Sequence, residues 1–314
     1  MDHNGATPNG LDFLWLELTN RCNLQCVHCY ADSHPNSGYR DLLSTEHYER
    51  VIEEAYRLGC RKIQFIGGEP QLNSDFDHLL RLAKKTGYDF IEVFSNLTRL
   101  TDETLDYAAE NDILFATSVY SCDPAVHDAV TKVRTSHTRT IGNLKKLIGH
   151  GVGARASVIA IDQDEDDLNR TTRFLEGLGV RYVKVGRIRE FGRAQEVMSR
   201  ESRLSGLCGH CWKGKLCVTP DGTVYPCVMA RQWPVGNVLH DTLSQIVNGE
   251  PLGRMRQSIY EQVWLGPSQC SPNCPQSCEP ENCPEAPCEP EICPMSCEPN
   301  EPCVPEVARP PEVR

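Results

Sequence analysis

The chain has no long apolar run and no cluster of basic residues, and each absence excludes a class of protein. Among its 314 residues, no stretch approaches the roughly 18 consecutive apolar residues that a membrane-spanning helix needs. Residues 1–10 hold neither a basic segment nor an apolar core, so we expect no secretory signal. Lys and Arg number 32 against 43 Asp and Glu, which disfavours binding to nucleic acids or to anionic membranes. We therefore expect a soluble, cytoplasmic protein.

Cysteine, in contrast, is abundant, with 17 residues in the chain. In a reducing compartment such a number indicates metal or redox chemistry rather than disulfides. Only two cysteines stand alone, and the other fifteen fall into three groups: Cys22, Cys26 and Cys29; Cys208, Cys211, Cys217 and Cys227; and eight residues from Cys270 to Cys303.

The composition changes near Gly266. From there to Arg314 the chain holds thirteen of its 21 prolines, nine Glu and eight Cys, with few large aliphatic side chains. Such a segment cannot build an apolar core, so it is folded by metal, clipped by disulfides or left disordered. We place the domain boundaries at 1–195, 196–265 and 266–314.

The first domain alternates between strand and helix patterns. Strands are predicted at 13–18, 62–66, 90–94, 113–119, 154–160 and 181–186. Helices are predicted at 45–58, 75–86, 102–110, 137–150 and 165–178. This alternation predicts an α/β fold with parallel strands, and six units favour a partial (β/α)6 barrel or an open sheet. Ligands of such folds bind at the carboxyl ends of the strands.

The second domain begins with a different pattern. Pro220-Asp221-Gly222 lies between two apolar segments, 215–219 and 223–228, and predicts a β-hairpin. Short helices are predicted near 241–248 and 252–263. The hairpin lies inside the second cysteine group.

The first cysteine group lies on one loop directly after the first strand. The spacing of Cys22, Cys26 and Cys29 supplies three thiolates, which hold three irons of a [4Fe–4S] cluster and leave the fourth iron open. A zinc loop completed by His28 or His34 is the alternative that the spacing leaves open.

The sequence ELTNRCNLQCVHCYA at 17–31, followed by Gly-Gly-Glu-Pro at 67–70, resembles the radical S-adenosylmethionine (SAM) superfamily. The resemblance implies that the three cysteines hold the cluster and that the open iron binds SAM. It also implies that one electron from an external reductant cleaves SAM. The resulting 5′-deoxyadenosyl radical then abstracts hydrogen from a substrate.

Residues at the strand ends are candidates for holding SAM. Gly67 and Gly68 allow close approach of the methionyl ammonium, and Glu69, before Pro70, supplies a carboxylate for it. The resemblance implies contacts with the ribose or carboxylate from Ser95, Asn96 and Ser118, with the carboxylate from Arg187, and with adenine from His28. The alternatives are an ordinary turn at 67–70 and capping, strand-end or surface roles for the other residues.

The second cysteine group resembles the first half of a SPASM extension, which follows many peptide-modifying enzymes of that superfamily and holds auxiliary iron–sulfur clusters. The cysteine spacing from Cys270 onward departs from the usual second half. We expect one auxiliary [4Fe–4S] cluster, held by Cys208, Cys211, Cys217 and Cys227, or by some of these with Cys270 or Cys274. A zinc ribbon is the alternative.

The two lone cysteines receive different interpretations. Cys122 follows the fourth strand, so its thiol is a candidate hydrogen-atom donor at the mouth of the barrel, with a small buried side chain as the alternative. Cys60 lies before the second strand, away from the site, and is interpreted as a core residue.

The resemblance implies a radical SAM enzyme that modifies a ribosomally made peptide by crosslinking, thioether formation or epimerisation. About a dozen residues precede the first strand, too few for a leader-binding domain, so a separate recognition protein is one way to select the peptide. Two alternatives stay open: a dehydrogenase acting on a small molecule such as a sugar or aminocyclitol, and a zinc-binding interaction protein.

Overall fold

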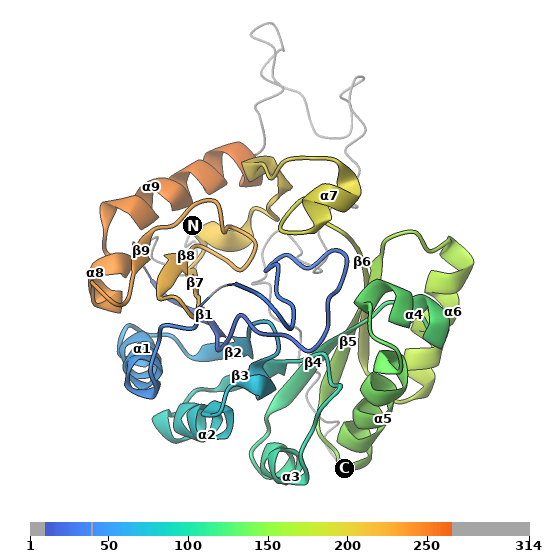
Figure 1. Ribbon diagram of the computed structural model, residues 1–314. Coiled ribbons are helices and arrows are strands. Elements are labelled where there is room, and N and C mark those ends of the chain that lie inside the picture. Colours follow the sequence, from blue (N-terminus) through green and yellow to red (C-terminus); the bar gives the residue numbers. More distant parts are fainter. Residues whose placement is uncertain (1–9, 39, 266–314) are drawn as a thin grey trace, which may run out of the picture.

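One curved sheet organises the computed structural model, which describes residues 10–38 and 40–265 (Figure 1). Within these residues the sheet has nine strands in the order β6-β5-β4-β3-β2-β1-β7-β8-β9. The bounds are β1 Phe13–Glu17, β2 Lys62–Ile66, β3 Phe90–Phe94, β4 Leu114–Val119, β5 Ala154–Ala160, β6 Tyr182–Arg187, β7 Lys215–Val218, β8 Thr223–Tyr225 and β9 Gly236–Asn237.

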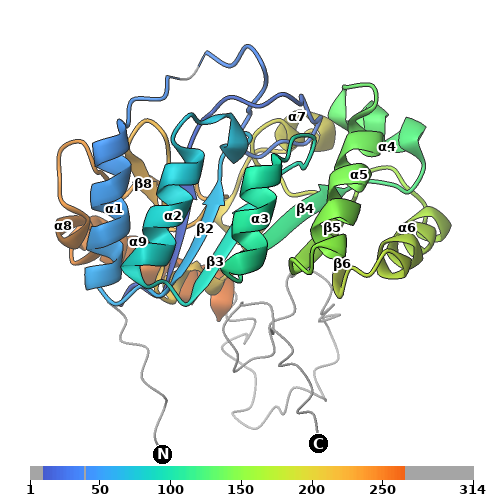
Figure 2. The same ribbon diagram turned by 90° about the horizontal axis from the view of Figure 1, so that it is seen from below.

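Strands β1 to β6 are parallel, and each pairs with the next along the chain. The six predicted strands and their parallel arrangement are therefore confirmed. The helices that connect them are α1 Thr45–Arg57, η1 Pro70–Leu72, α2 Phe76–Thr86, α3 Asp102–Glu110, α4 Pro124–Thr131, α5 Ser136–Gly149 and α6 Glu165–Gly177. Figure 2 shows α1, α2 and α3 in a row outside the strands.

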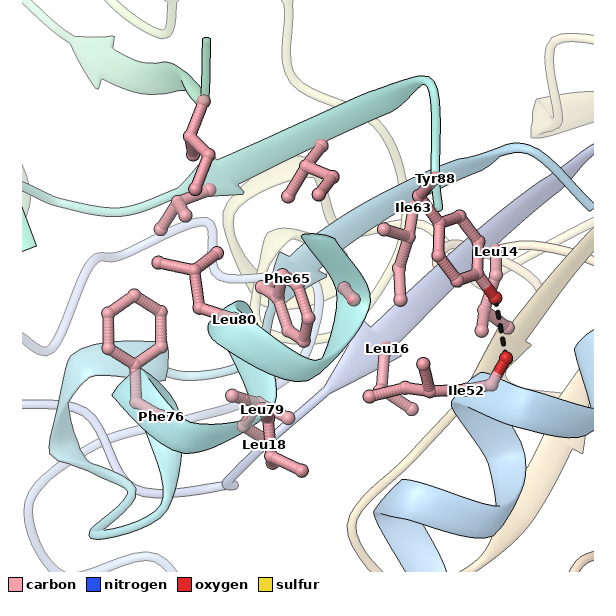
Figure 3. Packing of buried hydrophobic residues seen from close by; sticks show 14 of the residues in the cluster. Leu14, Leu16, Leu18, Ile52, Ile63, Phe65, Phe76, Leu79, Leu80 and Tyr88 are labelled. Carbon is pink, nitrogen blue, oxygen red and sulfur yellow. Dashed lines mark hydrogen bonds between the residues drawn. The ribbon is translucent and has the colours of Figure 1, made fainter. Parts of the chain in front are cut away.

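The main core lies between the outer face of the strands and these helices (Figure 3). Leu14 and Leu16 of β1 and Ile63 of β2 are fully buried there, because alternate strand residues face the helices. Each such aliphatic side chain contributes about 1.5–3 kcal/mol on burial. The opposite, inward-facing residues of the same strands are left to line the interior.

The sequence analysis missed α4. Asp123 caps this helix by accepting a hydrogen bond from the main-chain N–H of Ala125 at 2.7 Å, and Pro124 occupies its first position. An Asp-Pro pair is a recognised helix start, so the signal was present in the sequence.

The second region, residues 194–265, continues the same sheet. Strand β7 pairs in parallel with β1, with Phe13 opposite Lys215, and the predicted hairpin follows as antiparallel β7 and β8. The remaining elements are α7 Ala194–Met198, η2 Leu204–Gly206, η3 His210–Trp212, α8 Leu243–Val247, α9 Glu250–Ile259 and η4 Tyr260–Trp264. The pairing of β7 with β1 fastens this region to the opening strand.

The predicted repeat from 266 to 314, with Cys270 and Cys274, lies outside the described residues.

The prediction that the chain has no membrane-spanning helix concerns the described helices. Within residues 10–38 and 40–265, every helix is too short or too polar to cross a lipid bilayer.

Candidate functional site

A cavity of about 340 Å³ lies inside the curved sheet, and cysteines of both described groups line it: Cys22, Cys26, Cys29, Cys208, Cys211 and Cys227. Alternate residues of the strands face it, among them Phe13 and Trp15 of β1 and Ser118 of β4. Its volume falls within the range of about 300–1,000 Å³ that is usual for small-molecule sites. The cavity thus receives the first cysteine group from the loop after β1, and Cys208, Cys211 and Cys227 from the segments before β7 and after β8.

The first cysteine loop is fastened by Arg193, a residue to which the sequence analysis gave no role. Its Nε donates to the carbonyl of Cys26 at 2.9 Å, and its other nitrogens reach Asp32 Oδ1 at 2.7 Å and the carbonyl of Ser33 at 2.9 Å. Beside it, a Cβ on Gly192 would stand 2.3 Å from the carbonyl oxygen of Cys29. The Gly-Arg pair therefore fits closely against the loop that carries the three cysteines.

Burial makes the charged form of two thiols of this loop costly. Burial raises the pKa of Cys22 well above its usual range and that of Cys26 to about 12, so a bare thiolate there is costly. A bound metal offsets that cost, because thiolates bind metals in their deprotonated form.

The donors of the first loop are three cysteine sulfurs. In the described part of the chain, no three His, Cys, Asp or Glu side chains gather where one metal ion would bind them together. Three cysteine thiolates on one loop are donors that suit an iron–sulfur cluster.

The two glycines at 67–68 are required by the cysteine loop itself. A Cβ on Gly68 would lie 2.2 Å from the carbonyl oxygen of Arg21, and one on Gly67 would lie 2.6 Å from that of Thr19. The main-chain N–H of Gly68 donates to Thr19 O at 2.7 Å. Both glycines also line the cavity, so their backbone is available to a ligand.

Glu69 is fully buried, and its carboxylate is satisfied by hydrogen bonds within the protein. It is not among the residues that line the cavity, and its contact with SAM stays a prediction. Oε1 accepts from Ser95 Oγ at 2.9 Å and from the N–H of Gln71 at 3.2 Å, and Oε2 accepts from the N–H of Asn96 at 2.8 Å. The side chain therefore joins the end of β2 to the end of β3. Pro70, which begins η1, also lies outside the cavity wall.

The other predicted cofactor contacts do reach the cavity: His28, Ser95, Asn96, Ser118 and Arg187. Burial lowers the pKa of His28 to about 4, so its ring is neutral at physiological pH. Its Nδ1 is buried and has no hydrogen-bond partner among the residues that the structure describes. A neutral ring in this position suits packing against another ring system.

Cys122 is not among the residues that line this cavity. Its main-chain N–H donates to Thr171 Oγ1 of α6 at 2.8 Å. Its role as a hydrogen-atom donor stays a prediction. Cys60 is fully buried, and its thiol donates to the carbonyl of Lys62 at 3.2 Å, as expected of a core residue.

Three cysteines of the second group, Cys208, Cys211 and Cys227, lie together on the cavity wall. The contact with Cys211, followed by the positive charges of Arg189 and Lys215, lowers the pKa of Cys208 despite its burial. The contacts with Cys208 and Cys227, and burial, raise the pKa of Cys211. For Cys208 this is a thiolate-favouring environment facing the cavity, and it fits a metal site.

Cys217 stands apart from these three. It lies on β7, outside the cavity wall, with Sγ 3.8 Å from Glu17 Oε1. Glu17, at the end of β1, is fully buried and paired with Arg231. The guanidinium of Arg231 lies 5.6 Å from the ring centroid of Tyr30, which directly follows Cys29. This network joins the first cysteine loop to the second region, and no local sequence pattern pointed to it.

Comparison with known families agrees with both halves of this geometry. The model of the radical SAM superfamily matches residues 16–175. The SPASM model, an iron–sulfur cluster-binding domain, matches residues 198–284. The matches account for SAM and iron–sulfur clusters as cofactors, at the level of the two domains.

Two curated relatives come from Bacillus subtilis strain 168. AlbA, the antilisterial bacteriocin subtilosin biosynthesis protein, is 23% identical, over 77% of this chain and 60% of AlbA. SkfB, the sporulation killing factor maturation protein, is 24% identical, over 74% of this chain and 63% of SkfB. The chain thus spans about three fifths of the length of these relatives.

A solved structure shares the fold. SuiB of Streptococcus suis, crystallised with S-adenosylmethionine, superposes with a TM-score of 0.65 at 16% sequence identity, over 79% of this chain and 68% of SuiB. At this identity the likeness concerns the fold alone.

Proposed function

The chain belongs to the radical SAM superfamily, and from this membership we propose that it is an enzyme that cleaves SAM reductively in order to modify a ribosomally made peptide. The observation that supports this most is that two separate cysteine groups face one cavity of cofactor size. The names of AlbA and SkfB, which concern the biosynthesis and maturation of peptides, support a peptide substrate.

We assign the first [4Fe–4S] cluster to Cys22, Cys26 and Cys29. When bound, the cluster and SAM supply the 5′-deoxyadenosyl radical that abstracts a hydrogen atom from the substrate. The chain orients this chemistry, since Arg193 fixes the cysteine loop. The aromatic walls of the cavity, including Trp15, exclude water from the reacting groups.

We assign the SAM contacts to the cavity-facing candidates. The backbone of Gly67 and Gly68 receives the methionyl group, and Ser118 and Asn96 supply polar contacts for the ribose or carboxylate. His28 packs against adenine. Arg187, at the end of β6, is the cation for the SAM carboxylate.

For the second site we propose one auxiliary [4Fe–4S] cluster with Cys208, Cys211 and Cys227 as ligands. A fourth thiolate comes from Cys217 or from the tail, at Cys270 or Cys274. Residue 265, where the described chain ends, follows η4, and η4 packs against the element that carries Cys211. Five residues separate this point from Cys270, which is a reach of up to about 17 Å.

The proposal includes two partners. A one-electron reductant must reduce the first cluster, and a separate protein recognises the leader of the precursor peptide. We place the reaction in the cytoplasm, where a reducing environment keeps cysteines available to iron.

The test begins with anaerobic purification and reconstitution of the full chain with iron and sulfide. We expect a brown protein that releases 5′-deoxyadenosine from SAM when reductant is added, and no release from the C22A/C26A/C29A variant. Retained cleavage in that variant, or stoichiometric zinc in the loop without any 5′-deoxyadenosine, contradicts the assignment.

Precursor peptides encoded by neighbouring reading frames then identify the reaction. Loss of two hydrogen atoms from the peptide indicates crosslinking or oxidation, whereas unchanged composition with deuterium uptake from solvent indicates epimerisation. Modification of a sugar or aminocyclitol, but of no peptide, would instead favour the dehydrogenase alternative.

A further inference from the structure

Tyr120 makes a contact with the first cysteine loop that the proposed function does not use. It is the first residue after β4, and its hydroxyl lies 3.8 Å from Cys26 Sγ, in hydrogen-bonding geometry for sulfur. A phenol is protonated at neutral pH and can donate this bond. A metal-bound cysteine has lost its proton, so its sulfur can only accept.

The surroundings of Tyr120 fix its ring. Tyr120 is buried, with 6% exposure, and its ring contacts two imidazoles, those of His28 and His127, each with a centroid separation of 5.1 Å. Its main-chain N–H donates to His127 Nδ1 at 3.3 Å, and its carbonyl accepts from Gln163 Nε2 at 3.0 Å. The hydroxyl is therefore held toward the sulfur and needs no rearrangement when the charge there changes.

The donors to the first cysteines have different origins. Cys22 Sγ accepts from the N–H of Leu24 at 3.4 Å, within the same loop, and from Asn96 Nδ2 at 3.7 Å. The donor to Cys26 comes from a side chain 94 residues away along the chain. A side-chain donor can be removed without changing the loop, which makes its contribution measurable.

We propose that Tyr120 is a positioning residue whose hydroxyl donates a hydrogen bond to the Cys26 thiolate and raises the reduction potential of the first iron–sulfur cluster. The inference rests on the proposed function, because it takes Cys26 as a ligand of that cluster. Reduction adds negative charge that spreads onto the sulfur ligands. A donor at the sulfur stabilises that charge, so the reduced state gains more than the oxidised state.

The test is an anaerobic redox titration of the full, reconstituted chain, followed by electron paramagnetic resonance. The first cluster is recognised as the one whose signal changes when SAM is added. We expect Y120F to disfavour reduction by about tenfold, which is a fall of about 59 mV in midpoint potential for a one-electron couple.

Tyr88 provides the matched control. Its hydroxyl is also buried and donates at 2.8 Å, but to the carbonyl of Ile52 in the outer core (Figure 3). Y88F removes a buried hydrogen bond of similar kind far from the sulfur. We expect it to lower stability and to leave the potential unchanged.

A second substitution separates hydrogen bonding from packing. Site-specific 3-fluorotyrosine at position 120 keeps the ring and makes the hydroxyl a stronger donor, so we expect the potential to rise above that of the wild type. A packing effect would not reverse its sign between the two replacements. Equal potentials for the wild type, Y120F and the fluorinated variant overturn the inference.

The same titration distinguishes failure of the proposed function from failure of the inference about Tyr120. If no signal responds to SAM, the assignment of the first cluster fails, whatever the effect of Tyr120. If the signal responds to SAM but the midpoint potential is the same in the wild type and in the variants at position 120, only the inference fails.

Discussion

The two cysteine groups face one cavity, but the chain builds them in different ways. The first group comes from a single loop, at positions 22, 26 and 29, directly after β1. The second is collected from the region of η3, from β7 and from the turn after β8, and its predicted tail ligands lie outside the described residues. A local loop can be recognised from spacing alone, whereas a collected site depends on how distant elements pair.

The interactions that hold the two cysteine groups in place also differ. Arg193 donates to two carbonyl oxygens and pairs with Asp32 on the first loop, and the exposures of the Arg193 and Asp32 side chains are 15% and 45%. Arg231, beside the second group, pairs with Glu17, and the exposures of these two side chains are 21% and 1%. Both arginines are charged donors, so the difference lies in the carboxylate, which is half-exposed on the first loop and fully buried on β1.

The largest expected difference between the groups is in activity. C208A/C211A/C227A should stop formation of the modified peptide while SAM cleavage persists, because the first cluster is separate. The first triple variant should lower SAM cleavage by at least about a thousandfold, since its residues act as a unit. Parallel assays of 5′-deoxyadenosine and of peptide mass check this. Equal loss of both products in the two variants would mean that the groups form one functional unit.

The next largest effect is on stability and concerns the buried pair. R231M leaves the Glu17 carboxylate buried without its cation, so we expect the free energy of unfolding to fall by about 3–5 kcal/mol. E17Q/R231M should recover much of the loss, because no charge is left unpaired. Denaturant titration measures both variants.

Arg254 gives the control for that experiment. Its pair with Glu250 is exposed on α9, with side-chain exposures of 69% and 74%, so R254M should cost less than about 1 kcal/mol. Equal costs for R231M and R254M would show that the pair between β1 and the second region is not structurally important.

A third prediction concerns the loss of stability at low pH, to which His127 of the cavity wall contributes. Burial, and the neighbouring His137, lower the pKa of His127 to about 4, while Asp128 opposes the shift. Between pH 6.5 and 4 the unfolded state binds a proton that the folded state does not, so stability falls as the pH falls. Its full contribution is about 3 kcal/mol, from about 1.4 kcal/mol per pKa unit.

The substitution H127N tests this sign. Asparagine keeps an acceptor near Nδ1 but cannot titrate, so the loss of stability from pH 6.5 to 4 should become smaller. An unchanged slope in H127N would show that His127 is protonated as readily in the folded protein as in the unfolded chain.

The sequence predicted what depends on local pattern. The six parallel strands were recognisable because their apolar residues alternate with helical segments, and the first cysteine loop because its spacing is short. The place of β7 beside β1 was not predictable in this way. The two strands are about 200 residues apart, and the sequence pattern of a strand does not determine which other strand it pairs with.

The sequence also could not predict which residues after a strand face the cavity. Glu69 and Cys122 both follow strand ends, where chemistry is expected, yet neither is among the residues that line the cavity. The Glu69 carboxylate accepts from the N–H of Asn96, and the main-chain N–H of Cys122 donates to Thr171, so both residues bond to other elements. The type of a residue at a strand end is readable from the sequence, but its orientation is set by tertiary contacts.

Substitution of Cys122 should change activity and stability least, because this thiol belongs to neither cysteine group. Its side chain lies outside the cavity wall, beside α6. C122S should therefore change the rate of peptide modification by less than about twofold and the stability by less than about 0.5 kcal/mol, as for a substitution away from the site. Peptide mass and 5′-deoxyadenosine, measured in one assay, provide the readout. If C122S kept SAM cleavage but lost product, a thiol outside the wall would have to reach the substrate, and the cavity would have to open toward α6 during turnover.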